Sequence, residues 1–291
     1  MANAITKFKK YIDLLDEVYK LASLTAKLDS DSTLARAGAN ANEIVIPKIS
    51  MDALADYSRN SGYVSGDVTL TNETVAFNYD RGRKFNVDEM DNEETVGLAF
   101  GKLAGEFIRT KVVPELDAFR FATYAGISGI STVAGAALST GSDVIAALRA
   151  ATNTMDEDEV PYEGRELFIT PTLKGLIDDL DTTKSREVLS RYSSVTLVPQ
   201  SRFYTAIELK DGTTDGETAG GYAKAAAAKN INFMVIRKDA LMQYPKHTVN
   251  KIFTPQENQS ADAWIFAYRA YGLADAYENK VAGIYLHKST T

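Results

Sequence analysis

The sequence predicts an α+β fold, in which helices and strands are mixed along the chain without a regular order. Some segments place apolar residues three or four positions apart, as helices do, and others alternate apolar and polar residues, as strands do. The regular strand–helix alternation of a parallel α/β sheet is missing, and no repeat of fixed period occurs. The 291 residues are 45% hydrophobic and 24% charged, which is typical of a globular protein with an apolar core.

The first thirty residues have a helical pattern. Ile5, Phe8, Ile12 and Leu15 recur at spacings of three and four, which predicts an amphipathic helix with one apolar face. That face either packs on the chain's own domain or belongs to an arm that lies on a neighbouring subunit, and the pattern leaves both interpretations open. Residues 29–42 lose the periodicity and are rich in Ser, Ala and Asn, which indicates a linker.

Residues 44–88 carry the longest strand pattern. The first run contains Pro47, which suits an edge strand. Apolar residues then fall on even positions up to Leu70 and on odd positions from Val75, so we expect a turn or bulge across residues 71–74. A strand of about 22 residues would reach roughly 70 Å, whereas a compact chain of this length has a radius of gyration of about 19 Å. The segment therefore folds back on itself or projects from the body.

A long helix is predicted after residue 90. Asp91 and Glu94, three residues apart, resemble a capping box at its start. Pro114 lacks a backbone N–H and should kink this helix. The apolar stripe begins with Val96, Phe100, Leu103 and Phe107.

Three glycines mark one face of the same helix. Gly97, Gly101 and Gly105 are four residues apart, a spacing that in an apolar segment would indicate pairing of membrane helices. The charged residues between them exclude a membrane span. Because each glycine costs a helix about 1 kcal/mol, we predict a groove where another backbone packs closely, with Pro114 as a further packing position.

Shorter elements follow in the second half. A helix over residues 143–155 should begin with Ser142 as its N-cap. Residues 264–268 alternate and residues 281–286 are apolar after a turn, which predicts two antiparallel strands that close the fold. The elements expected between them are a strand at 167–169, a helix at 172–180, a strand at 195–198, a turn-rich loop at 211–221 and a strand at 231–236.

The composition argues against most kinds of chemistry. There are 32 basic and 39 acidic residues, a net charge of −7, whereas a nucleic-acid reader is usually basic. Cysteine is absent, which excludes disulfides and thiolate sites. His247 and His287 are interpreted as structural, and the acidic run at 156–159 as a solvated loop. No phosphate-binding loop, dinucleotide fingerprint, nucleophile elbow or zinc-binding helix motif occurs, so we expect no catalytic residue, no cofactor and no metal.

The termini and apolar runs predict no membrane contact. No apolar stretch approaches the roughly 18 residues of a membrane span, and the first residues lack the apolar run and cleavage site of a signal peptide. We therefore expect a protein that is made in a cytoplasm and has no membrane partner.

Two features are candidates for contacts between subunits. The chain has 15 tyrosines, Tyr63 among them, and tyrosine favours interfaces, although ordinary strand composition explains the number equally well. Arg81, Arg83 and Lys84 concentrate positive charge. They form either a solvated edge that discourages aggregation or a contact with an acidic residue, such as Asp88, of another subunit.

Several stretches resemble a known family. Residues 62–71 (GYVSGDVTLT), 77–85 (FNYDRGRKF) and 88–95 (DEMDNEET) resemble the extended loop and following spine helix of tailed-bacteriophage major capsid proteins with the Hong Kong 97 fold. Residues 264–287 are similar to the closing strands of that family. The order of the segments agrees along nearly the whole chain.

The resemblance implies an α+β capsid fold with an extended β-hairpin loop, a spine helix, and peripheral and axial domains. Contacts between subunits are then expected at Tyr63, Asp67, Arg81, Arg83, Lys84 and Asp88. The implied divisions are an N-terminal arm at 1–43, the extended loop at 44–90, a peripheral domain with the spine helix at 91–155, an axial domain at 156–245, and C-terminal strands that return to the peripheral domain at 246–291.

The implied function is that of a structural subunit, not an enzyme, in an icosahedral head that encloses double-stranded DNA. Many copies would assemble in the bacterial host cytoplasm as pentamers and hexamers of the virion, with portal and decoration proteins as further partners. About 40 residues precede Ile44, too few for a cleaved scaffolding segment, so a separate scaffolding protein is expected. An encapsulin-type nanocompartment shell, which packages enzymes, is the alternative.

Overall fold

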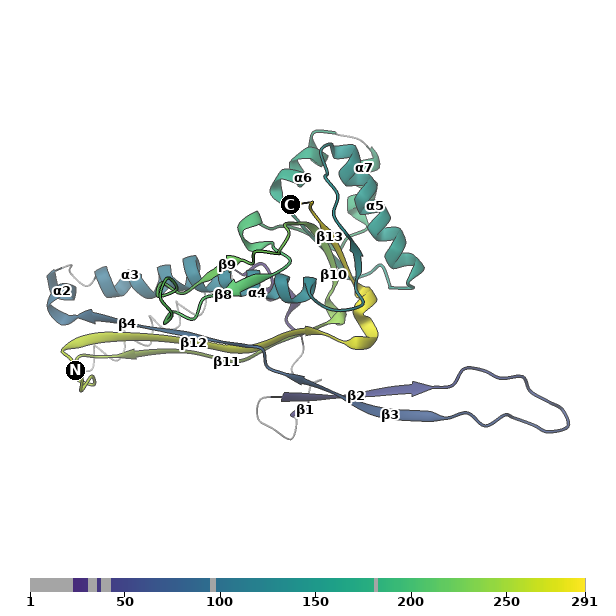
Figure 1. The fold of residues 1–291 in the computed structure, drawn as a ribbon, viewed down its shortest axis with the longest axis horizontal. Coiled ribbons are helices and arrows are strands. Elements are labelled where there is room, and N and C mark those ends of the chain that lie inside the picture. Colours follow the sequence, from purple (N-terminus) through teal and green to yellow (C-terminus); the bar gives the residue numbers. More distant parts are fainter. Residues whose placement is uncertain (1–22, 31–35, 38–42, 95–97, 181–182, 291) are drawn as a thin grey trace.

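The computed structural model describes residues 23–30, 36–37, 43–94, 98–180 and 183–290. It has the α+β architecture that the sequence predicts, with a long sheet under a long helix, a second sheet flanked by helices, and a projecting hairpin (Figure 1). Residues 1–22 of the predicted N-terminal helix and most of the linker after it lie outside the described residues, and residues 23–30, also within that prediction, form only a short 3-10 helix at Ala26–Leu28.

The long sheet has three antiparallel strands in the order β11-β12-β4. The strands are β4 (Tyr79–Asp88), β11 (Leu241–Phe253) and β12 (Ala263–Ala276). Sequence reasoning missed β11. Its register with β12 shifts between Pro245 and His247, as expected where a proline removes a ladder hydrogen bond in an edge strand.

A broken helix covers one face of this sheet. It consists of α2 (Glu89–Glu94), α3 (Leu98–Phe107), the π-helix η3 (Ile108–Val112) and α4 (Val113–Ala125). The interruption predicted near Pro114 is present, because the π-helix ends just before it and Pro114 lies in the first turn of α4, where no N–H is required. Ile108, Val112 and Leu116 pack on Phe266 and Tyr268 of the sheet.

The start of this helix differs from the prediction. The helix begins at Glu89, and the Asp88 carboxylate, not that of Asp91, accepts a hydrogen bond from the N–H of Met90 at 3.0 Å. Gly97 lies outside the described residues, and Gly101 and Gly105 lie on α3. The glycine groove stays a prediction.

The second sheet has five strands in the order β5-β13-β10-β6-β7. They are β5 (Ser131–Val133), β6 (Arg165–Ile169), β7 (Ser194–Leu197), β10 (Ile231–Arg237) and β13 (Ile284–Lys288). The predicted strands at 167–169, 195–198 and 231–236 are confirmed in type and place.

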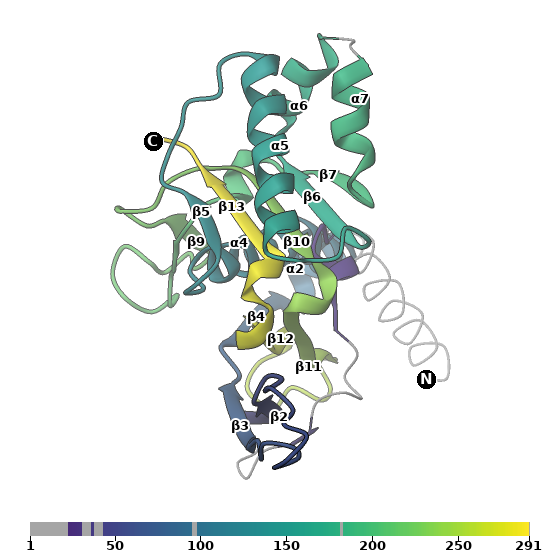
Figure 2. The ribbon, with the colours of Figure 1, turned by 90° about the vertical axis from the view of Figure 1, so that its right-hand side faces the viewer.

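Helices cover both faces of this sheet, and Figure 2 shows the face that α5, α6 and α7 cover. The helices on the outer side are α5 (Gly141–Glu157), α6 (Pro171–Asp178) and α7 (Thr183–Ser190). Along β10, Phe233 and Val235 point toward α5 and α6, while Met234 and Ile236 point toward α4. Side chains of a strand alternate between its two faces. The apolar residues from Phe233 to Ile236 follow one another without a break because both faces of β10 are buried.

Two predictions in this half were wrong. Thr140, not Ser142, caps α5 and forms a capping box with Asp143, because the helix begins earlier than the apolar stripe suggests. The closing strands are not a hairpin: β12 pairs with β11 and β4, and β13 pairs with β10 and β5. The 3-10 helix η6 (Glu278–Gly283) carries the chain from one sheet to the other.

The projecting hairpin belongs to a small sheet of three strands. These are β1 (Arg36–Ala37), β2 (Glu43–Met51) and β3 (Val68–Ala76). β1 pairs only as far as Val45, so the segment of β2 that holds Pro47 pairs on one side only, with β3, among the described residues. The predicted turn or bulge at residues 71–74 is wrong, because β2 and β3 pair in unbroken register.

The change of apolar residues from even to odd positions, which suggested this turn, has another cause. Val75 is buried at the base of the hairpin, whereas Leu70 lies further out and is 69% exposed. An apolar side chain marks the buried face of a strand only where the strand packs on a core, and the outer half of this hairpin packs on none within the chain. Residues 79–88 leave the hairpin and join the long sheet as β4.

The remaining elements are short. They are the two-stranded hairpin β8 (Ile207–Leu209) and β9 (Tyr222–Lys224), and the 3-10 helices η1 (Ala26–Leu28), η4 (Gln200–Arg202) and η5 (Lys238–Ala240).

Candidate functional site

The hairpin β2–β3 carries most of the exposed apolar surface. Of the twelve large hydrophobic side chains that are exposed among the described residues, eight lie between residues 49 and 70. Leu54 and Tyr63 are the most exposed of them, at 104% and 90%. A group of exposed apolar side chains of this kind indicates an interaction surface.

The end of the hairpin has local order of its own. The N–H of Asp67 donates to the Asp52 carboxylate at 2.8 Å, and the N–H of Asp52 donates to the carbonyl of Asp67 at 3.1 Å. Tyr57 and Tyr63 contact each other edge to face, with ring centroids 4.9 Å apart. These contacts hold Tyr63 outward and place Asp67 where β3 begins.

The base of the hairpin is fixed to the body. Ile44 and Val75 are buried against Met242 and Leu273 of the long sheet. Asn78 continues the pairing after β3 ends, because its side-chain amide donates to the carbonyl of Ala274 and accepts from its N–H. The hairpin is therefore a buried base with an exposed outer half.

The basic cluster predicted for contacts between subunits lies on β4, in the body. Arg81 is half-buried and pairs with Glu115 of α4 at 2.7 Å. Burial opposes its charge, but the hydrogen bond and the charge of Glu115 raise the pKa of Arg81 above its ordinary value. Arg83 donates to the carbonyl of Thr218 at 3.0 Å. The described contacts of both arginines are thus made within the chain.

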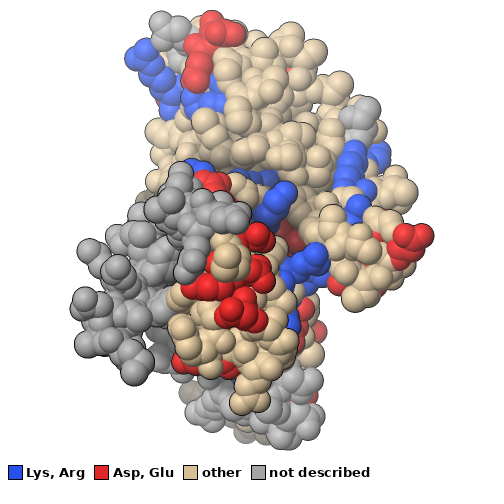
Figure 3. All heavy atoms as spheres, turned by 90° about the vertical axis from the view of Figure 1, so that its left-hand side faces the viewer, with Lys and Arg blue, Asp and Glu red and all other residues tan. Residues whose placement is uncertain are grey.

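Lys84 and Asp88 are exposed residues of the same strand. Asp88 opens an acidic stretch with Glu89 and Asp91, and acidic side chains gather over α2 at this end of the molecule (Figure 3). This end lies opposite the hairpin along the long axis (Figure 1). The cluster of Arg81, Arg83, Lys84 and Asp88 is therefore separated in space from Tyr63 and Asp67.

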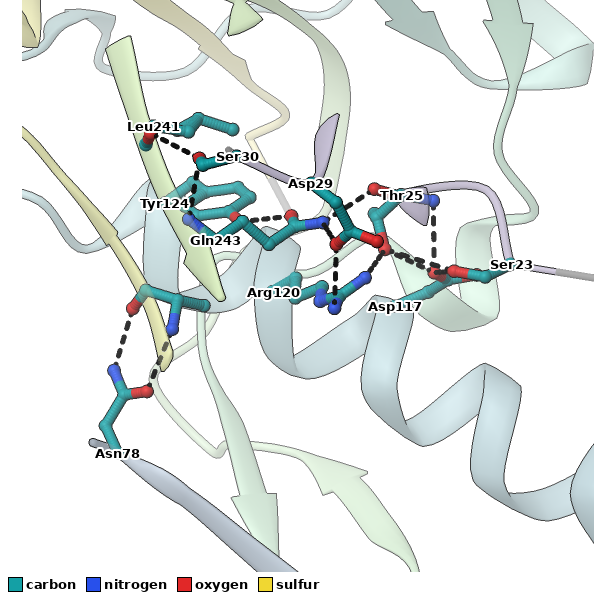
Figure 4. Close-up of polar contacts among 11 residues, drawn as sticks. Ser23, Thr25, Asp29, Ser30, Asn78, Asp117, Arg120, Tyr124, Leu241 and Gln243 are labelled. Carbon is teal, nitrogen blue, oxygen red and sulfur yellow. Dashed lines mark hydrogen bonds and ion pairs between the residues drawn. The ribbon is translucent and has the colours of Figure 1, made fainter. Parts of the chain in front are cut away.

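A second site fastens the N-terminal segment to α4 (Figure 4). Asp117 is fully buried and accepts hydrogen bonds from the hydroxyls of Ser23 and Thr25, at 2.9 and 2.7 Å, and from the N–H groups of Leu24 and Thr25. Arg202 of η4 lies 3.3 Å from its other side. The carboxylate thereby joins three separate parts of the chain.

Gln243 completes this anchor from β11 (Figure 4). Its amide nitrogen donates to the carbonyl of Thr25 at 2.8 Å and to the carboxylate of Asp29, and its amide oxygen accepts from the hydroxyl of Tyr124. Burial raises the pKa of Tyr124 far above its ordinary value, so the phenol stays a donor. Ser30 bonds the backbone of β11 at Leu241.

Sequence reasoning missed this anchor entirely. The one local signal is Asp117, a charged residue between Leu116 and Ala118 on the buried face of a helix. A buried charge requires partners, but those partners lie more than 80 positions away along the chain in either direction.

The structure places the acidic run and the two histidines that the sequence singled out. The described residues contain no group of three or more His, Asp or Glu that could hold a metal, and none of their helices is long and apolar enough to cross a membrane. The acidic run at 156–159 contributes Asp156 to ion pairs with Arg165 and Arg191. His287 is buried and stacks on Phe233, and His247 is exposed on β11.

These features define a Hong Kong 97-like capsid fold, as predicted, with a projecting hairpin, a long helix on a long sheet, and a second sheet flanked by helices. No protein-family model and no curated protein matches the sequence. The similarity is to solved structures. That of Mycobacterium phage Che8 superposes with a TM-score of 0.62 at 12% identity, over 91% of this chain and 90% of that chain.

Two other solved structures extend the likeness. That of Gordonia phage Cozz gives a TM-score of 0.61 at 14% identity, over 92% of this chain and 87% of that one. A virus-like particle from Pyrococcus furiosus gives 0.58 at 11% identity, over 97% of this chain and 99% of that one. At such identities the likeness establishes the fold.

Proposed function

We propose that the chain is the structural subunit of an icosahedral phage head, which self-assembles into pentamers and hexamers that enclose double-stranded DNA. The observation that carries this proposal is the hairpin: its outer half exposes Leu54, Tyr63 and their neighbours, which have no core to cover them in one subunit. In a fold shared with phage capsids, a second copy is the partner that would bury them.

The roles of the segments follow from this proposal. Residues 1–43 would act as an N-terminal arm and 44–90 as the extended loop, of which β4 lies in the long sheet. Residues 91–155 would form a peripheral domain with the spine helix, although α5 at the end of this range packs on the second sheet. Residues 156–245 would form the axial domain near the fivefold and sixfold centres, and 246–291 would lead back to the peripheral domain through β12, whereas β13 belongs to the second sheet.

The proposed contacts between subunits fall into two groups. Tyr63 and Asp67 lie on the hairpin and would reach over a neighbouring subunit, a role that the exposure of Tyr63 supports. Arg81, Arg83, Lys84 and Asp88 would meet another neighbour from β4. Lys84 and Asp88 are the stronger candidates, because Arg81 already pairs with Glu115.

Further partners are proposed on the same basis. They are a separate scaffolding protein, a portal protein and a decoration protein, with assembly in the bacterial host cytoplasm before the virion is complete. Contact with packaged DNA would be non-specific, because a wall that bound phosphates tightly would hinder packing, and the net charge of −7 fits weak contact. The chain would need no cofactor, membrane or catalytic residue for this role.

The named neighbours favour this function over an encapsulin-type nanocompartment. Several of them are capsids of phages, among them Cyanophage P-SCSP1u and Staphylococcus phage Andhra.

Electron microscopy of the expressed chain tests the proposal. Purified protein, alone and with the scaffolding protein encoded beside it, is expected to form closed shells in negative stain. A chain that stays monomeric at every concentration, in both preparations, would contradict the proposed function.

A further inference from the structure

The loop between β8 and β9, residues 210–221, lies against β4 and is called the flap below. It is braced internally. The N–H of Lys210 donates to the carbonyl of Gly221 at 2.9 Å, and the Asp211 carboxylate accepts from the N–H groups of Thr213 and Thr214, at 2.7 and 2.8 Å. The hydroxyl of Thr214 donates to the same carboxylate at 2.6 Å, and this bond together with the two N–H donors holds the pKa of Asp211 well below its ordinary value.

Arg81 holds both ends of the flap. Its Nη1 donates to the carbonyl of Lys210 at 2.8 Å, and its Nη2 donates to the carbonyl of Gly221 at 3.2 Å. Glu115 of α4 fixes the same guanidinium, because its carboxylate accepts from Nε at 2.7 Å. One side chain of β4 thus ties the flap to the long helix.

Arg83 holds the middle of the flap. It lies two residues after Arg81, so both side chains leave the same face of β4, and its Nη2 donates to the carbonyl of Thr218 at 3.0 Å. Gly212 lies so close that a Cβ there would be 2.8 Å from Nη1 of Arg83. Glycine at this position leaves room for the guanidinium.

Three hydrogen bonds from these two arginines join β4 to the flap. Each acceptor is a backbone carbonyl, and the nearby charge of Asp211 in the flap also favours the charged form of Arg81. The attachment therefore depends on two side chains of β4, and it can be removed without changing the flap.

A cavity of about 640 Å³ lies beside this attachment, bounded by β4, α3 and the flap. Phe85, Phe107 and Tyr268 form its aromatic wall, and Ala219 and Gly220 contribute the flap side. Phe85 and Phe107 contact each other edge to face at 4.8 Å. The flap thus forms part of the wall of a cavity that is lined by aromatic residues and by charged residues such as Arg81 and Glu115.

We propose that the flap is a latched lid: Arg81 and Arg83 hold it closed over the aromatic cavity, and release of this latch uncovers the cavity and separates the β8–β9 hairpin from β4. The device acts within one subunit, so it goes beyond the proposed shell function and does not depend on it.

Distance measurements by spin labelling test the latch. The chain has no cysteine, so Thr218→Cys in the flap and Lys251→Cys on β11, both exposed positions, place two labels without further changes. Pulsed electron paramagnetic resonance on dilute, unassembled subunits is expected to give one narrow distance distribution for the latched flap.

Two latch variants should change this distribution. Arg83→Ala removes the contact with Thr218, and the pair Arg81→Met and Glu115→Gln removes the hold on both ends without leaving a carboxylate unpaired. Both are expected to broaden the distribution and shift it to longer distances. Arg109→Ala is the matched control, because Arg109 is exposed and pairs with Glu106 on its own helix.

The outcome decides the proposal in each case. Unchanged distributions in the latch variants would overturn it, as would an equal broadening in the control. If the paired variant does not fold, Arg83→Ala alone is decisive, because its described hydrogen bond is to the flap. The result is independent of shell formation, so failure of the lid and failure of the shell function are distinguishable.

Discussion

Buried polar side chains decide how the N-terminal segment attaches to the body. Asp117, Thr25 and Gln243 are each 0% exposed, and each has its hydrogen-bonding atoms satisfied by distant parts of the chain. A buried polar group that loses its partner costs the desolvation of that group, and this penalty exceeds the net gain of an ordinary hydrogen bond. The attachment is therefore more sensitive to a single substitution than an apolar contact of equal size.

Asp117→Asn is expected to destabilise the subunit by about 3 kcal/mol, because an amide turns one acceptor into a donor that faces the donors of Ser23 and Thr25. Urea denaturation measures the change. Asp178→Asn is the matched control: Asp178 is exposed and pairs only with Lys174 on its own helix, so its loss should be within about 0.5 kcal/mol. Equal losses in the two variants would contradict the anchor.

His287 predicts a loss of stability in acid. Its Nδ1 lies 3.1 Å from the amide nitrogen of Asn232, which also donates to the carbonyl of Ala136. The amide nitrogen is thus the donor and Nδ1 must be unprotonated. Burial lowers the pKa of His287 below its ordinary value of 6.5, so the unfolded chain binds this proton more readily than the folded one.

Stability should therefore be full above about pH 6.5 and should fall as the pH drops below that value. His287→Phe is expected to flatten this part of the pH profile of unfolding. His247→Gln, which changes the exposed histidine on β11, should leave the profile unchanged. A parent profile that His287→Phe does not alter would count against this assignment.

At the scale of elements, helix starts are set by side chains just outside the apolar stripe. Thr140 accepts from the N–H of Asp143 at 3.2 Å, and the Asp143 carboxylate accepts from the N–H of Thr140 at 3.1 Å. Asp88 likewise bonds the first turn of α2. In both places a second polar residue lies nearby in the sequence, Ser142 for α5 and Asp91 for α2. The position at which the backbone becomes helical determines which of the two residues acts as the cap.

Thr140→Ala should destabilise the subunit by about 1 kcal/mol, the usual cost of removing an N-cap hydroxyl. Ser142→Ala is the matched control, because Ser142 lies inside the first turn and its loss should change stability by less than about 0.5 kcal/mol. Thermal unfolding of the two variants measures the difference. A larger loss of stability in Ser142→Ala than in Thr140→Ala would show that Ser142 is the cap.

At the scale of the whole molecule, the projecting hairpin lies at one end of the long axis and α2 lies at the other (Figure 1). Two different surfaces of one chain, rather than one self-complementary patch, generate rings or open assemblies when copies associate. Such a shape suits a subunit that meets several neighbours at once.

The pair Leu54→Ser and Tyr63→Ser should leave the fold intact and weaken contact between subunits. Burying a large apolar side chain contributes about 1.5–3 kcal/mol, so each loss should weaken association by about tenfold or more. The yield of shells in sedimentation measures the effect, with circular dichroism as the check on folding. Tyr162→Ser is the control, since Tyr162 is also exposed, at 67%, but lies outside the hairpin. A normal yield of shells from the variant with both substitutions would show that these hairpin residues make no contact needed for assembly.

The sequence by itself determined the fold class, most of the second sheet and the break at Pro114, because periodicity and proline act locally. It misjudged the caps, the closing strands and the turn at residues 71–74. Each of these depends on which side of a segment meets the rest of the chain, and the sequence pattern cannot show that.

Only the tertiary structure decided the sites. It brought Asp117 to Ser23 and Gln243 to Thr25, and it moved Arg81 and Arg83 from the projecting segment to β4, where they hold residues 210–221. These groups are separated by about a hundred positions or more along the chain. Many of the partner atoms are backbone carbonyls and N–H groups, which every residue carries, so their meeting depends on how the sheets pack and not on any local pattern.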